Sequence, residues 1–160
     1  MEPVRSRCLE RESERCQTQM KTLTGTRFGD IEYDPEQTMQ FPEGLIGFPH
    51  LHHFIVMPQT KPGPLFWIQS VDDPAMAFVL TDPGGFFLDY AVAPDAGERI
   101  KLGIGDEDEC LVLAVVTVPP DRKITLNLAA PILFAPKTHR ALQVILEKTS
   151  WQTRTPLPAA

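Results

Sequence analysis

From Lys21 onward, short apolar runs alternate with turn-forming Gly, Pro and Asp, a pattern typical of an all-β domain. Eleven of these runs are predicted as strands, at residues 21–28, 31–33, 38–41, 54–57, 66–70, 77–81, 90–92, 110–118, 124–127, 132–134 and 141–145. A sheet of so many short strands twists and curls until its edges are removed. The expected fold class is therefore mostly β: a small closed or partly open antiparallel β-barrel-like domain with one short helix.

One predicted strand differs from the others in its pattern. Residues 111–116 read Leu-Val-Leu-Ala-Val-Val and lack any polar alternation. Because a strand with one solvated face alternates apolar and polar positions, both faces of this strand are expected to be covered. We place it deepest in the core.

The sequence predicts a single short helix that begins near Pro94. Proline fits the first turn, the carboxylate of Asp95 is favourable beside a helix N-terminus, and Gly103 stands where a left-handed residue ends a helix. The helix is expected to pack on the barrel through Ile100 and Leu102.

The chain divides into three parts by composition. Residues 1–20 are rich in Arg, Glu, Ser and Gln and cannot bury enough surface to offset chain entropy, so they are read as a mobile extension. Residues 21–156 form the β-barrel domain, and residues 157–160 are a flexible tail.

The formal net charge of -6 belongs to the domain, because the four arginines and four glutamates of the extension cancel. A nucleic-acid-binding protein needs a cationic face, and no Lys/Arg cluster follows Arg15, so no direct nucleic-acid binding is expected. RNA binding through the extension is a weaker alternative, and it would use Arg5, Arg7, Arg11 and Arg15. An acidic domain suits a basic protein partner better.

Several classes of protein are excluded by what the sequence lacks. No apolar run is long enough to span a bilayer, and the charged start is unlike a secretory signal, so a cytoplasmic protein without membrane contact is expected. The three cysteines form no framework of pairs, and Cys110 is read as a small buried hydrophobe while Cys8 and Cys16 lie in the polar extension. A monomer is the default oligomeric state.

Candidate chemistry is sparse. Asp72 and Asp73 precede Pro74, and an Asp-Pro step is typical of a turn whose carboxylates bond local backbone amides. The tract His50–His53 offers imidazoles but no matching cysteine or carboxylate, and 106–109 is an acidic turn without the spacing of a calcium loop. No catalytic, cofactor or metal site is predicted. The alternative left open is a small metal-dependent hydrolase that uses Asp72, Asp73 and the His50–His53 tract.

The most unusual segment is apolar. Residues 41–49 read Phe-Pro-Glu-Gly-Leu-Ile-Gly-Phe-Pro, and their Pro and Gly content forbids regular structure. Since loops usually run over the surface, this segment is either a hydrophobic patch that contacts a partner or a plug that caps the barrel, with Phe41 and Phe48 inside. Both readings stay open at this point.

Several short motifs recur in order along the domain. They are Thr26-x-Phe28-Gly29-x-Ile31-Glu32, Phe41-Pro42-Glu43-Gly44-x-x-Gly47-Phe48, Phe66-Trp67-x-Gln69-Ser70-Val71-Asp72-Asp73-Pro74, Ala77-Phe78-Val79-x-Thr81-Asp82-Pro83, Val115-x-Thr117-Val118-Pro119, Asn127-Leu128-x-Ala130-Pro131-Ile132 and Gln143-Val144-Ile145-Leu146. Taken together, they resemble the flagellar assembly factor (FliW) family over nearly all of residues 21–156. The chain departs from the family pattern at Ile46, where many members have Pro.

The resemblance implies a function in protein binding without catalysis. Members of the family bind flagellin in the cytoplasm and, when free of it, bind the carbon storage regulator (CsrA), an RNA-binding repressor of flagellin translation. A protein of this kind acts as a chaperone and as a CsrA antagonist that relieves repression. It needs no cofactor and makes no covalent bond.

The candidate partner-binding surface combines the apolar loop with the Trp- and Asp-containing motif. Its predicted contact residues are Phe41, Pro42, Leu45, Ile46, Trp67, Gln69, Asp72 and Asp73.

Overall fold

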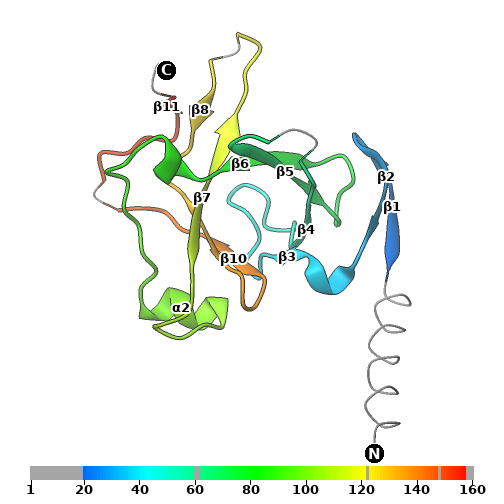
Figure 1. Cartoon of the computed structure of the whole chain (residues 1–160), viewed down its shortest axis with the longest axis horizontal. Coiled ribbons are helices and arrows are strands. Elements are labelled where there is room, and N and C mark those ends of the chain that lie inside the picture. The colour runs from blue at the N-terminus through cyan, green and yellow to red at the C-terminus, as the bar shows by residue number, and fades with distance from the viewer. Residues whose placement is uncertain (1–19, 60–61, 122, 148, 158–160) are drawn as a thin grey trace, which may run out of the picture.

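A computed structural model describes residues 20–59, 62–121, 123–147 and 149–157. Its centre is a closed seven-stranded barrel, as predicted from the many short strands. The barrel strands are β3 (Met39–Gln40), β4 (His53–Val56), β5 (Leu65–Ser70), β6 (Ala77–Thr81), β7 (Leu111–Thr117), β9 (Ile132–Ala135) and β10 (Arg140–Gln143). Figure 1 shows them around a common centre.

Two pairings close the barrel. β7 pairs with β9 as well as with β6, and β3 pairs in parallel with β10 through Gln40 and Arg140. The other barrel pairings are antiparallel, as the sequence predicts. Because β7 also pairs with β8 (Thr125–Leu126), which carries β11 (Thr155–Pro156), this part of the sheet continues beyond the barrel.

β7 has both faces covered, which confirms the expectation drawn from its lack of alternation. Leu113 belongs to the barrel interior together with Phe54 and Ile68. Its neighbour Ala114 points the opposite way, into a second cluster on the outside of the barrel that includes Trp151. Only the ends of the strand are exposed.

The outer cluster also explains a wrong strand prediction. Residues 90–92 form no strand, because Tyr90 turns inward and its hydroxyl donates to the Leu128 carbonyl oxygen at 2.7 Å. The ring packs edge-on against Trp151, with 5.1 Å between ring centroids. The hydrogen bond and the ring packing of Tyr90 thus hold this segment in place of the backbone pairing of a strand. The short strand β11 was not predicted at all.

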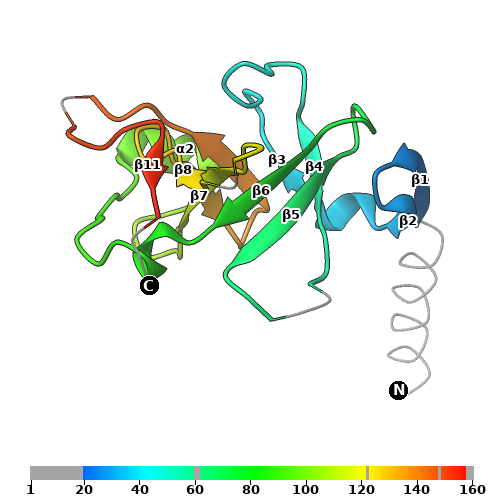
Figure 2. The ribbon, with the colours of Figure 1, turned by 90° about the horizontal axis from the view of Figure 1, so that it is seen from above.

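A separate hairpin of β1 (Lys21–Thr26) and β2 (Gly29–Tyr33) stands beside the barrel. Figure 1 shows it next to β4 and β5, and the view from above in Figure 2 places it on the same side. Its tip covers Trp67 of β5: the Arg27 guanidinium lies 4.4 Å from the ring centroid, and Phe28 meets the ring edge-on at 5.6 Å. Such contacts hold the hairpin to the outer wall.

Helix α2 (Ala96–Leu102) lies against β10 and begins with a capping box. The Asp95 carboxylate accepts from the Glu98 amide, and Glu98 accepts from the Asp95 amide. The prediction that Pro94 lies in the first turn is therefore wrong, because Pro94 precedes the cap. Gly103, with φ 71, ends the helix as expected.

The predicted packing of the helix is only half right. Leu102 is fully buried, whereas Ile100 is 77% exposed. Positions 100 and 102 lie about 200° apart around a helix, so a helix with one packed face cannot bury both. None of the helices in the described part of the chain is long and apolar enough to cross a membrane.

Short 3-10 helices η1 (Pro35–Gln37) and η2 (Pro83–Gly85) fill two connections, each begun by an Asp side chain that accepts from a backbone amide. Cys110 is half-buried, and burial raises the pKa of its thiol. The predicted extension, with Cys8 and Cys16 and its four arginines, lies outside the described residues apart from Met20.

Candidate partner-binding surface

The apolar loop after β3 is built from two tight turns. The Gly44 amide donates to the Phe41 carbonyl oxygen at 3.0 Å, and the Phe48 amide donates to the Leu45 carbonyl oxygen at 2.8 Å. Gly47 has φ 88, a value that the third position of a type II turn requires. A Cβ at Gly44 would lie 2.6 Å from the Pro49 carbonyl oxygen, so this position accepts only glycine.

These turns sort the side chains of the loop into two groups. Phe41 and Leu45 are 0% and 4% exposed and belong to the barrel interior. Phe41 packs edge-on against Phe54, with 5.3 Å between ring centroids. The two residues are therefore removed from the predicted contact surface, since buried side chains cannot touch a partner.

Within the two turns, residues 41–48, the exposed residues are Pro42, Glu43, Ile46 and Gly47, and we call this set the crest. Ile46 lies at the apex of the second turn and is 49% exposed. The plug reading is thus confirmed for Phe41 and Leu45, which lie in the barrel interior, whereas Ile46 faces solvent. The partner-contact reading stays a prediction for the exposed residues.

The crest is held from three sides. The Ile46 amide donates to Gln143 Oε1 of β10 at 2.8 Å, and the Gln143 side-chain amide donates in turn to the Ala130 carbonyl oxygen at 3.0 Å. Lys101 of α2 pairs with Glu43 at 3.0 Å. The hydrogen bonds of Gln143 order the loop before any partner arrives, which reduces the entropy lost on binding, whereas the exposed Lys101–Glu43 pair adds little.

The third support comes from Asp72. Its Oδ2 atom accepts from the amides of His52 and His53 at 2.7 and 2.8 Å, and His52 Nδ1 lies 2.8 Å from the Phe41 carbonyl oxygen. Partial burial acts to raise the pKa of Asp72. The two amide hydrogen bonds and the nearby His53 ring outweigh that effect and hold the pKa below its ordinary value.

Replacing Asp72 by Asn is expected to lower the free energy of unfolding at neutral pH, because an ionised acceptor bonds backbone amides more strongly than a neutral one. Since solvent screens this exposed site, the expected loss is only about 1 kcal/mol. Since the folded pKa is depressed, that stability is present above 3.8 and is lost as pH falls through the folded pKa. Urea unfolding of both proteins between about pH 7 and pH 3 should show the gap closing with acid. A gap that stays constant with pH would contradict this role.

Gln69 is the polar residue that the sequence placed wrongly. It is 0% exposed, so it too leaves the predicted contact surface. Its side-chain amide lies within 3.0 Å of the carbonyl oxygens of Ser70, Pro74 and Met76. Gln69 therefore shapes the turn that carries Asp72.

The remaining carboxylate and the histidines have local structural roles. Asp73 accepts from the Ala75 amide at 3.0 Å, the turn chemistry that the Asp-Pro step predicts. His53 Nδ1 lies 3.5 Å from Asp72 Oδ1, and His50 is exposed. Among the described residues, no group of three or more His, Cys, Asp or Glu side chains is placed to hold a metal ion. Nothing in this arrangement favours the hydrolase alternative.

Trp67 lies away from the crest and lines a separate groove. A groove of about 430 Å³ lies between the hairpin tip and the β4–β5 connection, and its walls include Phe28, Met57 and Trp67. Trp67 is half-buried beneath Arg27 and Phe28. The eight predicted contact residues therefore do not form one surface: Pro42 and Ile46 are exposed on the crest, Asp72 and Asp73 support the turns beside it, and Trp67 lies on the outer wall of β5.

Comparison with known proteins gives one consistent family. Residues 22–157 match the profile of the family described as FliW protein. A flagellar assembly factor FliW of Syntrophotalea carbinolica is 67% identical over 140 residues, covering 88% of this chain and 100% of that protein. The flagellar assembly factor FliW 2 of Desulfotalea psychrophila is 62% identical over 133 residues, covering 83% of this chain and 88% of that protein. A crystal structure of the flagellar assembly factor FliW has a TM-score of 0.78 at 29% identity and covers 87% of this chain and 98% of that one.

Proposed function

We propose that this chain, which belongs to the FliW protein family, works as a flagellar assembly factor by binding other proteins reversibly. In this proposal the protein is a cytoplasmic monomer that holds flagellin as a chaperone. When flagellin is exported, the freed factor binds CsrA and relieves repression of flagellin translation. The family sets the expectation of these two partners.

The observation that carries the proposal is the crest. Ile46 presents half of an aliphatic side chain to solvent at a fixed position, between supports from β10, α2 and the Asp72 turn. A preordered apolar contact rimmed by polar groups is the composition found at the centre of protein interfaces. A surface of this kind binds a partner without any bond being made or broken.

Exchange between two partners follows from mass action. A partner that binds the same or an overlapping surface more tightly, or at a higher free concentration, displaces the other. The acidic turn at 106–109 and the net charge of -6 speed association with a basic partner surface. Flagellin export then acts as the switch, because it lowers the free concentration of one competitor.

Size-exclusion chromatography of the purified chain with flagellin and with CsrA tests the proposal. We expect co-elution with each partner separately at micromolar concentration, and release of CsrA when flagellin is added in excess. Absence of both complexes would sink the proposal. Simultaneous binding of the two partners in one complex would remove the exchange step but keep the binding function.

A further inference from the structure

A second surface hollow lies on the outside of the barrel, across β10, β3 and β4. Gln40, His53 and Arg140 each stand next to a buried residue in their strand, so their own side chains point outward. Two hollows of about 420 and 220 Å³ meet here and share Gln40 and His53. We treat them as one groove, with Lys101 of α2 at one end and Lys21 of β1 at the other. Pro42 of the crest lines it, and its residue Lys101 also pairs with Glu43 of the crest.

The groove differs in charge from the rest of the protein. Lys101 and Arg140 line one end and Lys21 lines the other, and no Asp or Glu lines either hollow. The chain as a whole carries a formal net charge of -6. Three lysine and arginine side chains are therefore gathered around a groove in a protein that is otherwise acidic.

The cations at the α2 end are available to a ligand. Within the described part of the chain, the Arg140 side chain has no hydrogen-bond or ion-pair partner, and its guanidinium lies beside Gly103 at the end of α2. Lys101 pairs only with Glu43, and both side chains are more than half exposed. An ion pair so exposed contributes little, so a carboxylate of a partner can replace Glu43 at small cost.

We propose that this groove binds an acidic linear segment of a partner protein. Carboxylates of the segment pair with Arg140 and Lys101 at one end and with Lys21 at the other. Arg140 offers a bidentate fork, the geometry that carboxylates match best. In the hollow that Lys21 lines, Tyr33, Pro35 and Val71 give the segment apolar contact. This surface is additional to the crest, and its test needs neither flagellin nor CsrA.

The same positive charges do not favour a nucleic acid. Affinity for a phosphate backbone rises with the number of phosphates neutralised, and three separated cations on a chain of net charge -6 neutralise few. A peptide needs only two or three carboxylates at matching positions. The three separated cations therefore favour an acidic peptide over a nucleic acid.

Fluorescence anisotropy with the full chain tests the groove. The probe is a fluorescein-labelled decapeptide that alternates Glu and Val, and the matched peptide has Lys in place of Glu. We expect the Glu peptide to bind at least about tenfold more tightly than the Lys peptide, and Arg140→Glu to weaken its binding about tenfold. Arg140→Gln, which places no negative charge at the end of α2, should weaken it by a smaller factor. Circular dichroism of each variant checks that the fold is retained.

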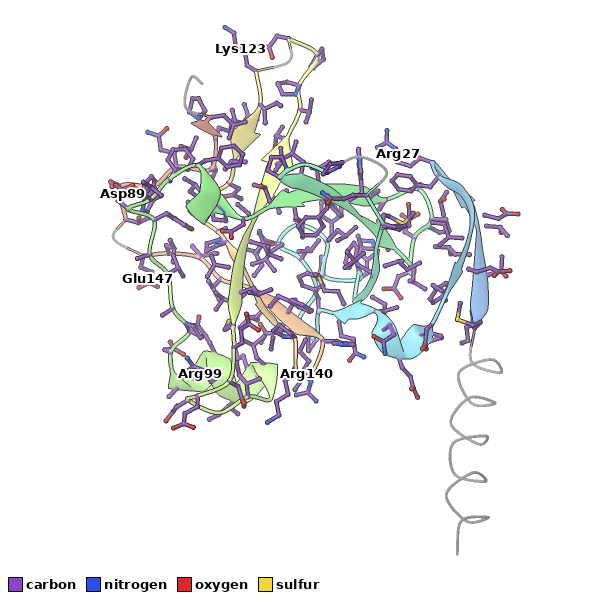
Figure 3. All side chains as sticks on the ribbon, viewed as in Figure 1. Arg27, Asp89, Arg99, Lys123, Arg140 and Glu147 are labelled. Atoms are coloured by element: carbon purple, nitrogen blue, oxygen red, sulfur yellow. The ribbon has the colours of Figure 1, made fainter. Side chains whose placement is uncertain are left out.

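Lys123→Glu is the matched control, because it makes the same change in net charge on an exposed residue outside the groove. Figure 3 shows Lys123 at the end of the molecule opposite Arg140 and α2. This variant should bind the Glu peptide within about twofold of the wild type. Equal losses for the two variants, equal binding of the two peptides, or tighter binding of a ten-nucleotide single-stranded RNA than of the Glu peptide would each overturn the proposal.

Discussion

Replacing Ile46 by Asp is expected to weaken binding to flagellin and to CsrA about 30-fold or more, roughly 2 kcal/mol, while the fold persists. The side chain is 49% exposed at the apex of a turn, so a carboxylate there stays hydrated in the free protein. In a complex, the same carboxylate would be buried without a partner, and the apolar contact of Ile46 would be lost. Isothermal titration calorimetry of each complex measures the difference.

A second exposed aliphatic residue, Leu88, provides the control for this experiment. Leu88 is 96% exposed and stands beside Asp89, which Figure 3 shows at the edge of the molecule away from the hairpin. Leu88→Asp makes the same kind of change from aliphatic to charged, and it should leave both affinities within about twofold because it touches no part of the crest. If Ile46→Asp binds both partners as the wild type does, the crest is not the contact surface.

Replacing the adjacent Leu45 by Asp is expected to unfold the protein. Leu45 is 4% exposed and packs within the barrel interior, so the change removes a buried aliphatic side chain and places a charge among Phe and Leu side chains. Loss of burial alone costs about 2–5 kcal/mol, and an unpaired buried carboxylate adds several more. The total approaches the whole stability of a small domain, about 5–15 kcal/mol. Near-UV circular dichroism and urea unfolding of the purified variant measure the effect.

Leu45→Met is the control for Leu45→Asp, because it changes the shape of the buried side chain without adding a charge. A volume-conserving apolar change costs less than about 1.5 kcal/mol, so this variant should fold and bind like the wild type. A folded Leu45→Asp protein with native near-UV circular dichroism would show that the 41–48 loop detaches from the barrel at little cost. The interior role assigned to Leu45 would then be wrong.

The sequence does not predict which of the neighbours Leu45 and Ile46 is buried and which is exposed. Leu45 and Ile46 are both aliphatic, and no periodicity applies in a segment broken by Pro and Gly. The turn geometry at Gly44 and Gly47 decides which one points inward. The strand and turn pattern, in contrast, is a local property, and β6 and the helix end at Gly103 are where the sequence predicts them.

Tertiary context explains the other differences. Gln69 lies in an apolar strand and reads as an exposed polar residue, yet it is buried because the next turn folds back over it and accepts its hydrogen bonds. Gln143 supports the crest only because β3 and β10 pair in parallel, and no local signal joins segments so far apart in the chain. The groove at Arg140 depends on the same pairing, so it too was missed.

Closure of the barrel by β3 and β10 has a consequence for biosynthesis. Ile46 and Gln143 are 97 positions apart, so the chain must be made beyond Arg140 before β10 can pair with β3. Until then β3 has an unpaired edge on a nascent chain that already contains β4, β5 and β6, and such edges promote aggregation. Contacts so distant in sequence also slow folding. During translation, this protein thus passes through an interval in which its incomplete sheet needs protection from unwanted pairing.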